Sequence, residues 1–350
     1  MVHLTLRDIA KALDLSVSTV SKALRDSYEI GEKTKKRVNE YARQHHYYPN
    51  RMAQSLKEGK TGSIGVVVCS LDNTFVAQML DGIDKVCTAN GYNIIIMQSK
   101  ESHSQEKACT GLLQARGIDG LLISPASETP DVEHLLALQR ASLPIVLFDR
   151  LSNDIDTHKV GIDNFQAAYQ ATHHLIECGY TRIAHLNSDI RLNITSERLG
   201  GYKKALYDHS IAFESTYVSY CNYSSASQLA QDIREALKRF MNLPNPPHAL
   251  FTAGDQITTK SIGIIHELGY QIPADIALIG FSNTELASSL YPPLSTIYQP
   301  AYEIGQLAAE KLIMLIKDQG KRILADEFET IKLPTRLDIR SSSHPFQKAP

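Results

Sequence analysis

A set of small or cationic side chains recurs at helical spacing early in the chain: Val17, Ser18, Ser21 and Lys22. A helix that presents such side chains on one face can enter the major groove of DNA without clash. Lys22 can donate to N7 and O6 of guanine, Val17 can pack on a thymine methyl, and Ser18 can bond either kind of base edge. Thr19, Ser21 and the helix N-terminus suit phosphate contacts. This spacing therefore predicts a surface that reads DNA bases.

Two short helices must position that surface. Thr5 and Asp8 are typical of a helix start, and apolar residues at 6, 9, 10 and 13 follow with helical spacing. After a turn of about three residues, Ser16 can cap a second helix whose residues 20, 23 and 24 face inward, which predicts a helix-turn-helix. A third helix is expected from about residue 32 to 45, with the basic run at 33–37 on its outer side. A plain helical pair from another kind of small domain is the alternative.

A marginal helix is expected next. Pro49 ends the third helix, and Asn50 can cap a helix of about seven residues, which is too short to form in water without support. Ala53 allows close approach, and Leu56 suits a wedge in a minor groove. An ordinary interdomain linker is the alternative. We expect the histidines at 45 and 46 to be packing and solvent residues, not metal ligands.

Composition and charge bound the class of protein. The length of 350 residues, with 43% hydrophobic and 21% charged residues, is typical of two or three globular domains. Residues 1–60 carry 12 Lys and Arg against 7 Asp and Glu, a net charge of +5, and the remainder has a net charge of −7. Such a basic segment on an acidic body indicates contact of that segment alone with a polyanion, and the charge asymmetry by itself fits a solvated basic face equally well.

Several absences narrow the function further. The five cysteines are scattered without CxxC spacing, which argues against a disulfide framework or a zinc knuckle and favours a reducing compartment. Residues 1–7 contain no apolar signal-peptide region, and the apolar runs are too short to span a membrane. We therefore expect a cytoplasmic protein with no membrane partner, no metal and no cofactor.

From residue 63 onward, apolar strand-sized runs alternate with helical patterns. Strands are expected at 64–69, 92–97, 120–123, 144–148, 182–186, 217–220, 249–252 and 277–281. This alternation predicts parallel sheets covered by helices on both faces. Gly-Tyr pairs at 91–92, 179–180 and 269–270 each precede a strand, which indicates two similar lobes. Crossovers between the lobes are expected near 152–159, near 283–294 and after 320.

Polar side chains follow most of these strands. Ligands of open α/β sheets bind in the crevice beyond the carboxyl ends of the strands, so these residues are site candidates, although loops contain such residues for no functional reason as well. The candidates are Ser70, Asp72, Asn73, Phe75, Gln98, Ser99, Ser124, Asp149, Arg150, Asp163, Asn164, Asn187, Asp189, Arg191, Arg198, Asp255, Ser282 and Asn283.

The stretches 5–24 (TLRDIAKALDLSVSTVSKAL) and 48–56 (YPNRMAQSL) resemble the headpiece and hinge of the lactose-repressor (LacI/GalR) family. The body carries further marks of that family at 149–150, 162–164, 197–202, 254–255, 280–283 and 292–300. The resemblance implies an all-α helix-turn-helix headpiece at 1–46, a hinge helix or linker at 47–61, and a two-lobed α/β, periplasmic-binding-protein-like domain with parallel sheets at 62–340. The N-lobe is expected at about 62–158 and 292–320, the C-lobe at about 159–291 and 321–340, and a tail at 341–350.

The resemblance also implies residue roles. Residues 17, 18 and 22 read bases, and Leu56 levers the central base step open. The expected DNA-contacting residues are Thr5, Leu6, Ser16, Val17, Ser18, Thr19, Ser21, Lys22, Asn50, Arg51, Ala53, Gln54 and Leu56. The expected effector-binding residues are Asp72, Phe75, Ser124, Asp149, Arg150, Asp163, Arg191, Arg198, Asp255, Ser282 and Asn283.

Three positions depart from the family pattern. Lys22 stands where arginine is commoner, and Gly31 replaces the usual serine cap of the third helix. Ser282 stands where most relatives carry aspartate, and a serine cannot supply the charged acceptor that grips sugar hydroxyls.

The implied function is that of a homodimeric transcription regulator, expected to be a repressor, on a near-palindromic double-stranded operator. A small effector, expected to be a carbohydrate, binds between the lobes and changes the angle between them. This change in turn alters the spacing of the paired hinge helices. A coupling of roughly 1–3 kcal/mol would change operator affinity about 5–150-fold. Constitutive DNA binding without an effector is one alternative. A transport-type solute-binding protein and an enzyme are two more, although G-x-S-x-G, P-loop, GxGxxG and H-E-x-x-H motifs are all missing.

Overall fold

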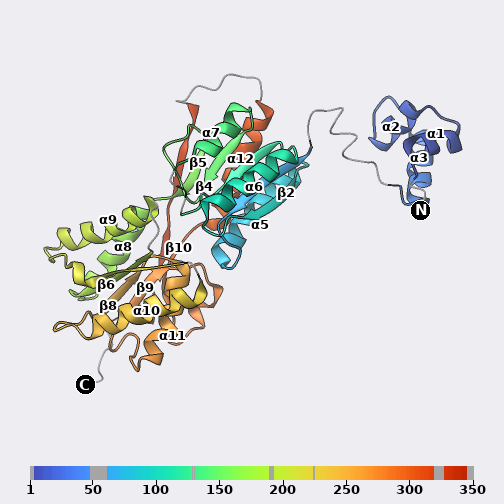
Figure 1. Cartoon of the computed structure of the whole chain (residues 1–350). Helices are drawn as coiled ribbons and strands as arrows, with labels where there is room; N and C mark the ends of the chain where they lie inside the picture. The colour runs from blue at the N-terminus through green and yellow to red at the C-terminus, as the bar shows by residue number, and fades with distance from the viewer. Residues whose placement is uncertain are drawn as a thin grey trace. The chain divides into compact units, whose positions relative to one another are not determined.

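The chain divides into two compact units, Met1–Thr61 and Gly62–Pro350. The structure is a computed structural model (Figure 1) and describes residues 4–47, 61–127, 129, 131–188, 193–223, 225–318 and 327–344. The expected contacts at Asn50, Arg51, Ala53, Gln54 and Leu56, and the one at Arg191, lie outside the described residues.

Three helices form the first unit: α1 (Leu6–Leu13), α2 (Val17–Leu24) and α3 (Glu32–Gln44). Thr5 and Asp8 make a reciprocal cap on α1, because the Thr5 side chain accepts the N–H of Asp8 and the Asp8 carboxylate accepts the N–H of Thr5. Ser16 caps α2 by accepting the N–H of Thr19 at 3.0 Å. Asp14, in the turn between α1 and α2, takes the left-handed conformation with φ of 51°. The predicted helix-turn-helix is confirmed.

A small apolar core joins the three helices, and its buried members are Ile9, Ala10, Leu13, Val20, Ala23 and Val38. The pattern places the basic run of α3 on the outer side, and for Lys35 this is wrong. Lys35 is buried, with its ammonium 2.7 Å from Asp26 and 3.1 Å from Glu32. Arg37 donates to the backbone carbonyl of Leu13 at 2.9 Å, which ties α3 to the end of α1. These two cations therefore stabilise the helical unit itself.

The second unit has two lobes, each built on a six-stranded sheet (Figure 1). The first sheet has the order β11-β5-β4-β3-β1-β2, and its pairs are parallel. Its strands are β1 (Ser63–Val68), β2 (Asn93–Gln98), β3 (Gly120–Ile123), β4 (Ile145–Phe148), β5 (Lys159–Ile162) and β11 (Thr330–Leu333). The inner strands β1 and β4 are buried on both faces and are continuous apolar runs, as parallel strands covered by helices require.

Four helices cover this first sheet: α5 (Thr74–Ala89), α6 (His103–Ala115), α7 (Glu133–Arg140) and α12 (Ala301–Lys317). Alternate residues of each strand pack on opposite faces. Val66 and Leu122 share one cluster with α5 and α12, whereas Val67 and Leu121 share another with α6 and α7. Helix α12 was not predicted, although it packs closely on α5 and on three strands of this sheet.

The second sheet has the order β12-β10-β9-β8-β6-β7, and only the β10–β12 pair among its described pairs is antiparallel. Its strands are β6 (Ile183–Ser188), β7 (Val218–Cys221), β8 (Ala249–Thr252), β9 (Ala277–Phe281), β10 (Ser295–Tyr298) and β12 (Arg336–Asp338). Its helices are α8 (Asn164–Glu177), α9 (Asn193–Asp208), α10 (Ala226–Met241) and α11 (Asp255–Glu267). Helices α8 and α9 share a core cluster with one face of this sheet, and α10 and α11 with the other.

The two-lobed α/β architecture with parallel sheets is confirmed, but the predicted lobe boundaries are wrong at three strands. β5 and β11 belong to the first sheet, and β10 belongs to the second. The polar stretch at 152–157 is a loop between β4 and β5, not a crossover. The chain passes between the sheets after β5, after β10 and between β11 and β12. Each misplaced strand has at least one partner that is distant in sequence, as in the pairs β5–β11 and β10–β12, so local pattern does not reveal which sheet it joins.

Candidate functional site

The outward face of α2 carries the side chains predicted to read bases. Val17 is 42% exposed and Ser18 is exposed, while Ser21 and Lys22 are partly exposed on the same face. The Lys22 ammonium makes an ion pair with Glu29, which the sequence pattern did not indicate. Lys22 therefore has an ionic partner within the chain. A hydrogen bond from Lys22 to a guanine edge would have to replace this ion pair.

The remaining predicted DNA contacts of the first unit have structural roles as well. The Thr5 hydroxyl donates to Oδ2 of Asp8 at 2.6 Å, and these hydrogen bonds from Thr5 lower the pKa of the Asp8 carboxyl. Leu6 is partly buried against the small apolar core. Ser16 and Thr19 are joined by a hydrogen bond of 2.8 Å between their hydroxyls at the start of α2.

A cavity of about 150 Å³ lies between the two lobes of the second unit, and both lobes contribute its walls. Seven of the predicted effector-binding residues line it: Asp72, Phe75, Ser124, Asp149, Arg150, Arg198 and Asp255. Ser124, Asp149 and Arg150 lie within two residues of the end of a strand, and the rule for open α/β sheets predicts such residues at the cavity. Asn73 positions Phe75 by capping α5, since its side chain accepts the N–H of Val76 at 2.8 Å.

Three predicted residues lie outside the cavity lining. Asp163 caps α8 by accepting the N–H of Gln166 at 2.9 Å. Ser282 and Asn283 are buried, with 1% and 2% exposure, and contact Asp255 instead. Polar residues after strands thus divide into those that face the cavity and those that hold helix ends or neighbouring side chains.

The wall from the first lobe is built on two adjacent acids and one arginine. Arg150 donates two hydrogen bonds of 2.6 and 2.7 Å to the Glu101 carboxylate. It also donates to the carbonyl of Pro125. Asp149 accepts the hydroxyl of Ser124 at 3.1 Å. Glu101 and Asp149 both take left-handed backbone conformations, with φ of 63° and 61°. Such conformations are costly for non-glycine residues and persist where surrounding contacts hold them, often at binding sites.

The charges of this wall are set by burial and by the arginine. Burial raises the pKa of Asp149 above its ordinary value, although the charges of Arg150 and Arg198 and the Ser124 hydrogen bond oppose the rise. Burial also disfavours the Glu101 carboxylate, but the hydrogen bonds and charge of Arg150 outweigh it and lower the pKa of Glu101. The Arg150–Glu101 pair is therefore fixed, whereas the Asp149 carboxylate is poorly compensated and suited to accept from a ligand.

Arg198 dominates the wall from the second lobe. Nε donates to Asn164 at 2.8 Å, Nη1 to the carbonyl of Ala253 at 2.6 Å and Nη2 to Oε1 of Gln299 at 3.3 Å. The guanidinium also lies 3.6 Å from the ring centroid of Phe281. Burial lowers the pKa of Arg198 to about 10, so it stays cationic at neutral pH. Three hydrogen bonds occupy three of its five N–H donors, and the fork is held rigidly at the cavity.

Asp255 supplies the carboxylate that position 282 lacks. Its Oδ1 accepts the hydroxyl of Ser282 at 2.5 Å and the N–H of Asn283 at 3.3 Å. Burial raises the pKa of Asp255, and these two hydrogen bonds partly offset the rise. A carboxyl group therefore faces the cavity from the second lobe despite the serine at 282.

Sequence reasoning missed several lining residues, among them Glu101, Thr195, Tyr223, Gln256 and Gln299. Gln299 follows β10, a strand that was not predicted. Glu101 lies three residues after β2 and becomes visible only through its pairing with Arg150. Tyr223 follows β7, and burial raises the pKa of its hydroxyl.

The described part of the chain has no helix that is both long and apolar enough to cross a membrane. All five cysteines are free thiols in the structure, and four of them are buried.

Comparison with known families gives two matches along the chain. Residues 5–50 match the family described as bacterial regulatory proteins, lacI family. Residues 172–343 match a periplasmic binding protein-like domain.

Individual proteins are similar over nearly the whole length. The HTH-type transcriptional repressor PurR of Aliivibrio salmonicida is 30% identical over 317 residues, covering 90% of this chain and 93% of the repressor. The catabolite control protein A of Priestia megaterium is 28% identical over 346 residues, covering 98% and 100%. The crystal structure of the lac repressor dimer bound to operator and the anti-inducer ONPF has a TM-score of 0.82 at 24% identity, covering 97% and 99%, which shows the shared fold.

Proposed function

Because this chain belongs to the lacI family of bacterial regulatory proteins and is a DNA-binding transcriptional regulator, we propose that it is a repressor controlled by a small, hydroxyl-rich molecule bound between its lobes. The observation that carries this proposal is the meeting, in one small cavity, of the Arg198 fork and two partly buried carboxyl groups, Asp149 and Asp255. The relatives named above are regulators, and we propose no catalytic step.

The cavity chemistry supports a carbohydrate or a similar polyol. Each sugar hydroxyl is both donor and acceptor, so it needs acceptors such as Asp149 and donors such as Arg198 around it. Phe75 and Tyr223 supply the apolar surface on which a ring can pack. The cavity of about 150 Å³ is below the roughly 300–1,000 Å³ of pockets for drug-sized ligands, which favours a small ligand.

The DNA-binding unit would place α2 in a major groove. We propose that Lys22 leaves Glu29 to donate to guanine, that Val17 packs on a thymine methyl, and that the start of α2 meets phosphate. The lac repressor that shares the fold is a dimer bound to its operator. The same assembly here would require a near-palindromic operator, and a regulator of DNA in bacteria acts in the cytoplasm.

DNA binding is tested by gel shift of the full-length protein with duplexes from its own chromosomal neighbourhood. We expect retardation of a fragment with a near-palindromic site. Lys22→Ala should lower affinity for that site roughly 5–150-fold, the cost of one base contact of about 1–3 kcal/mol, and affect unrelated DNA much less. Lys33→Ala, which removes an exposed lysine of α3, is the control and should weaken both kinds of DNA alike. Absence of retardation at low salt would overturn the proposal.

Effector binding is tested by a thermal-shift screen of sugars, sugar phosphates and nucleobases. A molecule that binds the folded protein raises the melting temperature by mass action. Arg198→Lys keeps the charge but loses the fork, so it should abolish the shift. Arg234→Lys, at a surface ion pair with Glu267, should retain it. A shift that survives Arg198→Lys would place the ligand elsewhere, and a nucleobase as the only hit would contradict the polyol class.

A further inference from the structure

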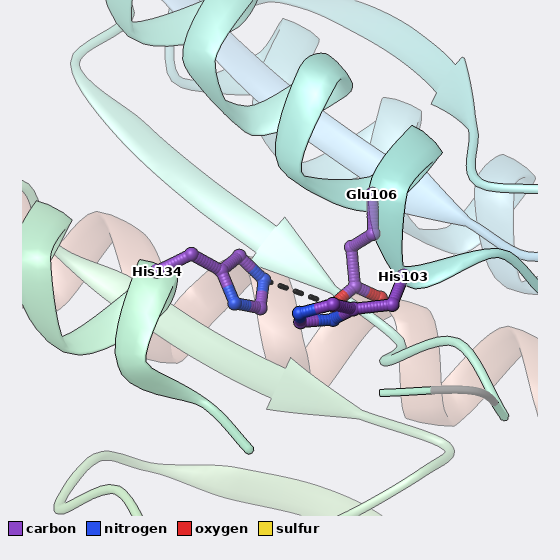
Figure 2. A group of neighbouring side chains, drawn as sticks. All are labelled: His103, Glu106 and His134. Carbon is purple, nitrogen blue, oxygen red and sulfur yellow. Dashed lines mark ion pairs between the residues drawn. The ribbon is translucent and has the colours of Figure 1, made fainter. Parts of the chain in front are cut away.

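Two histidines and a glutamate of the first lobe lie close together (Figure 2), and none of them lines the cavity. His103 and Glu106 are three residues apart near the start of α6, so they share one face of that helix. His134 comes from the first turn of α7 and points toward them. Nothing in the proposed function uses these three side chains.

Glu106 is a completely buried carboxylate, with 0% exposure. It accepts the backbone N–H of Ala126 and the hydroxyl of Thr129, the latter at 3.0 Å. Among the residues that the structure describes, its one ion pair is with His134, at 2.9 Å between Oε1 and Nε2. Neutral hydrogen bonds alone compensate a buried negative charge poorly, so a cation beside Glu106 would stabilise it.

His134 does not supply that cation with good geometry. Its side chain is only 8% exposed, and neither ring nitrogen makes an aligned hydrogen bond within the described residues. A buried imidazole without hydrogen bonds is costly, and the neutral ring carries a lone pair in the ring plane that can bind a metal ion.

His103 completes the set and has an outer partner. One of its ring nitrogens, Nδ1, lies 3.4 Å from the hydroxyl oxygen of Thr129, which also donates to Glu106. Thr129 thus orients two of the three side chains, as outer-sphere groups do around metal ligands. His103 is partly exposed, so the group can be reached from solvent.

We propose that His103, Glu106 and His134 form a binding site for a divalent transition metal ion of the Zn²⁺ class. Their ligand atoms all lie within 4.8 Å of one another. Tetrahedral ligands at about 2.1 Å from Zn²⁺ are about 3.4 Å apart, so small side-chain rotations complete the geometry. Two imidazoles with one carboxylate suit such ions, whereas Mg²⁺ and Ca²⁺ prefer oxygen ligands. A fourth ligand would be water from the side of His103.

The ion would fasten α6 and α7 to the segment after β3. Ala126 and Thr129, which bind Glu106, belong to the same segment as Ser124, which lines the interlobe cavity. The proposed metal site is therefore separate from the effector cavity. It holds the segment after β3, which also contributes Ser124 to the cavity lining. A bound ion should raise the stability of the folded protein by mass action.

The test is isothermal titration of full-length, chelator-treated protein with Zn²⁺, with Mg²⁺ as a comparison. We expect one Zn²⁺ per chain at this site, a rise in melting temperature, and no comparable binding of Mg²⁺. His103→Gln and His134→Gln should each weaken Zn²⁺ binding by more than roughly 100-fold, since loss of an outer-sphere partner alone costs ~10–100-fold. His266→Gln, at an exposed histidine of α11, is the matched control and should bind like the unmodified protein.

His103→Gln is the decisive variant, because the partly exposed position tolerates the change without loss of fold, which circular dichroism verifies. Substitution of Co²⁺ gives a second readout, since three nitrogen and oxygen ligands in a tetrahedral site produce visible absorption that Zn²⁺ then displaces. Failure of the unmodified protein to bind Zn²⁺, or equal binding by His103→Gln and His266→Gln, would overturn the proposal. In that case Glu106 and His134 would be a buried ion pair without a metal.

Discussion

Nδ2 of Asn283, in the second lobe, donates to Oε1 of Gln78 on α5 of the first lobe at 2.7 Å. The same amide donates to the carbonyl of Gln299 at 2.8 Å and accepts the N–H of Gln299 at 3.0 Å. Gln299 in turn accepts from Arg198 in the cavity wall. A continuous hydrogen-bonded path therefore joins the cavity to a contact between the lobes.

Gln78→Ala and Asn283→Ala should differ in cost. Gln78→Ala removes one hydrogen bond of a partly exposed side chain, about 0.5–1.5 kcal/mol of unfolding free energy. Asn283→Ala also leaves the backbone N–H and C=O of buried Gln299 without this partner, which adds about 1–3 kcal/mol. Urea unfolding monitored by circular dichroism measures both losses. Equal losses would show that the Gln299 contacts contribute nothing.

Glu29→Gln should strengthen binding to the operator. The variant removes the carboxylate that holds Lys22 and so lowers the cost of moving the ammonium to a base. An exposed ion pair is worth about 0.2–1 kcal/mol, which corresponds to a gain of roughly 1.4–5-fold. Glu40→Gln is the control, because it removes an equal charge from α3 at a carboxylate paired with Arg43. Equal gains in the two variants, measured by gel shift, would assign the effect to net charge alone.

His185 should make the stability of the second lobe fall as the pH is lowered. Burial lowers the pKa of His185 from 6.5 to about 3. Between these values the unfolded chain binds a proton that the folded chain does not, so this contribution is complete above pH 6.5 and is lost toward pH 3, at up to about 1.4 kcal/mol per pH unit. Its ring stacks between Tyr202 and Phe251, with centroid distances of 5.0 and 4.8 Å.

His185→Phe keeps that stack and removes the titration. The variant should be somewhat less stable than the unmodified protein at pH 7, because the hydrogen bond from His185 to the carbonyl of Phe251 is lost, and the gap should narrow or reverse by pH 5. Other buried histidines titrate in both proteins, so the difference between the two curves isolates His185. Urea unfolding at pH 7, 6 and 5 provides the curves, and parallel curves would contradict the assignment.

The sequence predicts a strand or a site residue when the feature follows from neighbouring residues in the chain. It does not predict those that depend on contacts with distant segments. The apolar runs of β1 and β4 predict buried parallel strands, because such strands need apolar side chains on both faces. The residues of β5, β11 and β12 include lysine, arginine and glycine, and the described partners of β11 and β12 lie at least 38 residues away in the sequence. The site follows the same division. Asp149 and Asp255 are found from their place after a strand, whereas Glu101, Gln299 and the pair of Glu106 with His134 depend on contacts across the fold.

Two glycine positions in helices of the first lobe should respond oppositely to alanine. At Gly82, on α5, an added Cβ would lie 2.1 Å from the carbonyl oxygen of Tyr302 on α12, so the two helix backbones would have to separate. Overpacking of this kind costs about 1–3 kcal/mol. At Gly111, on the exposed side of α6, an added Cβ meets no described atom within 4 Å, and alanine lowers the entropy of the unfolded chain. We therefore expect Gly82→Ala to lower the melting temperature. Gly111→Ala should raise it, through a gain of about 0.4–1 kcal/mol in stability.

Gly305→Ala, whose Cβ would lie 2.0 Å from the carbonyl oxygen of Met79, repeats the test of the α5–α12 contact from α12. If both contact glycines accept alanine without loss, the close approach of α5 and α12 does not limit the packing of this lobe.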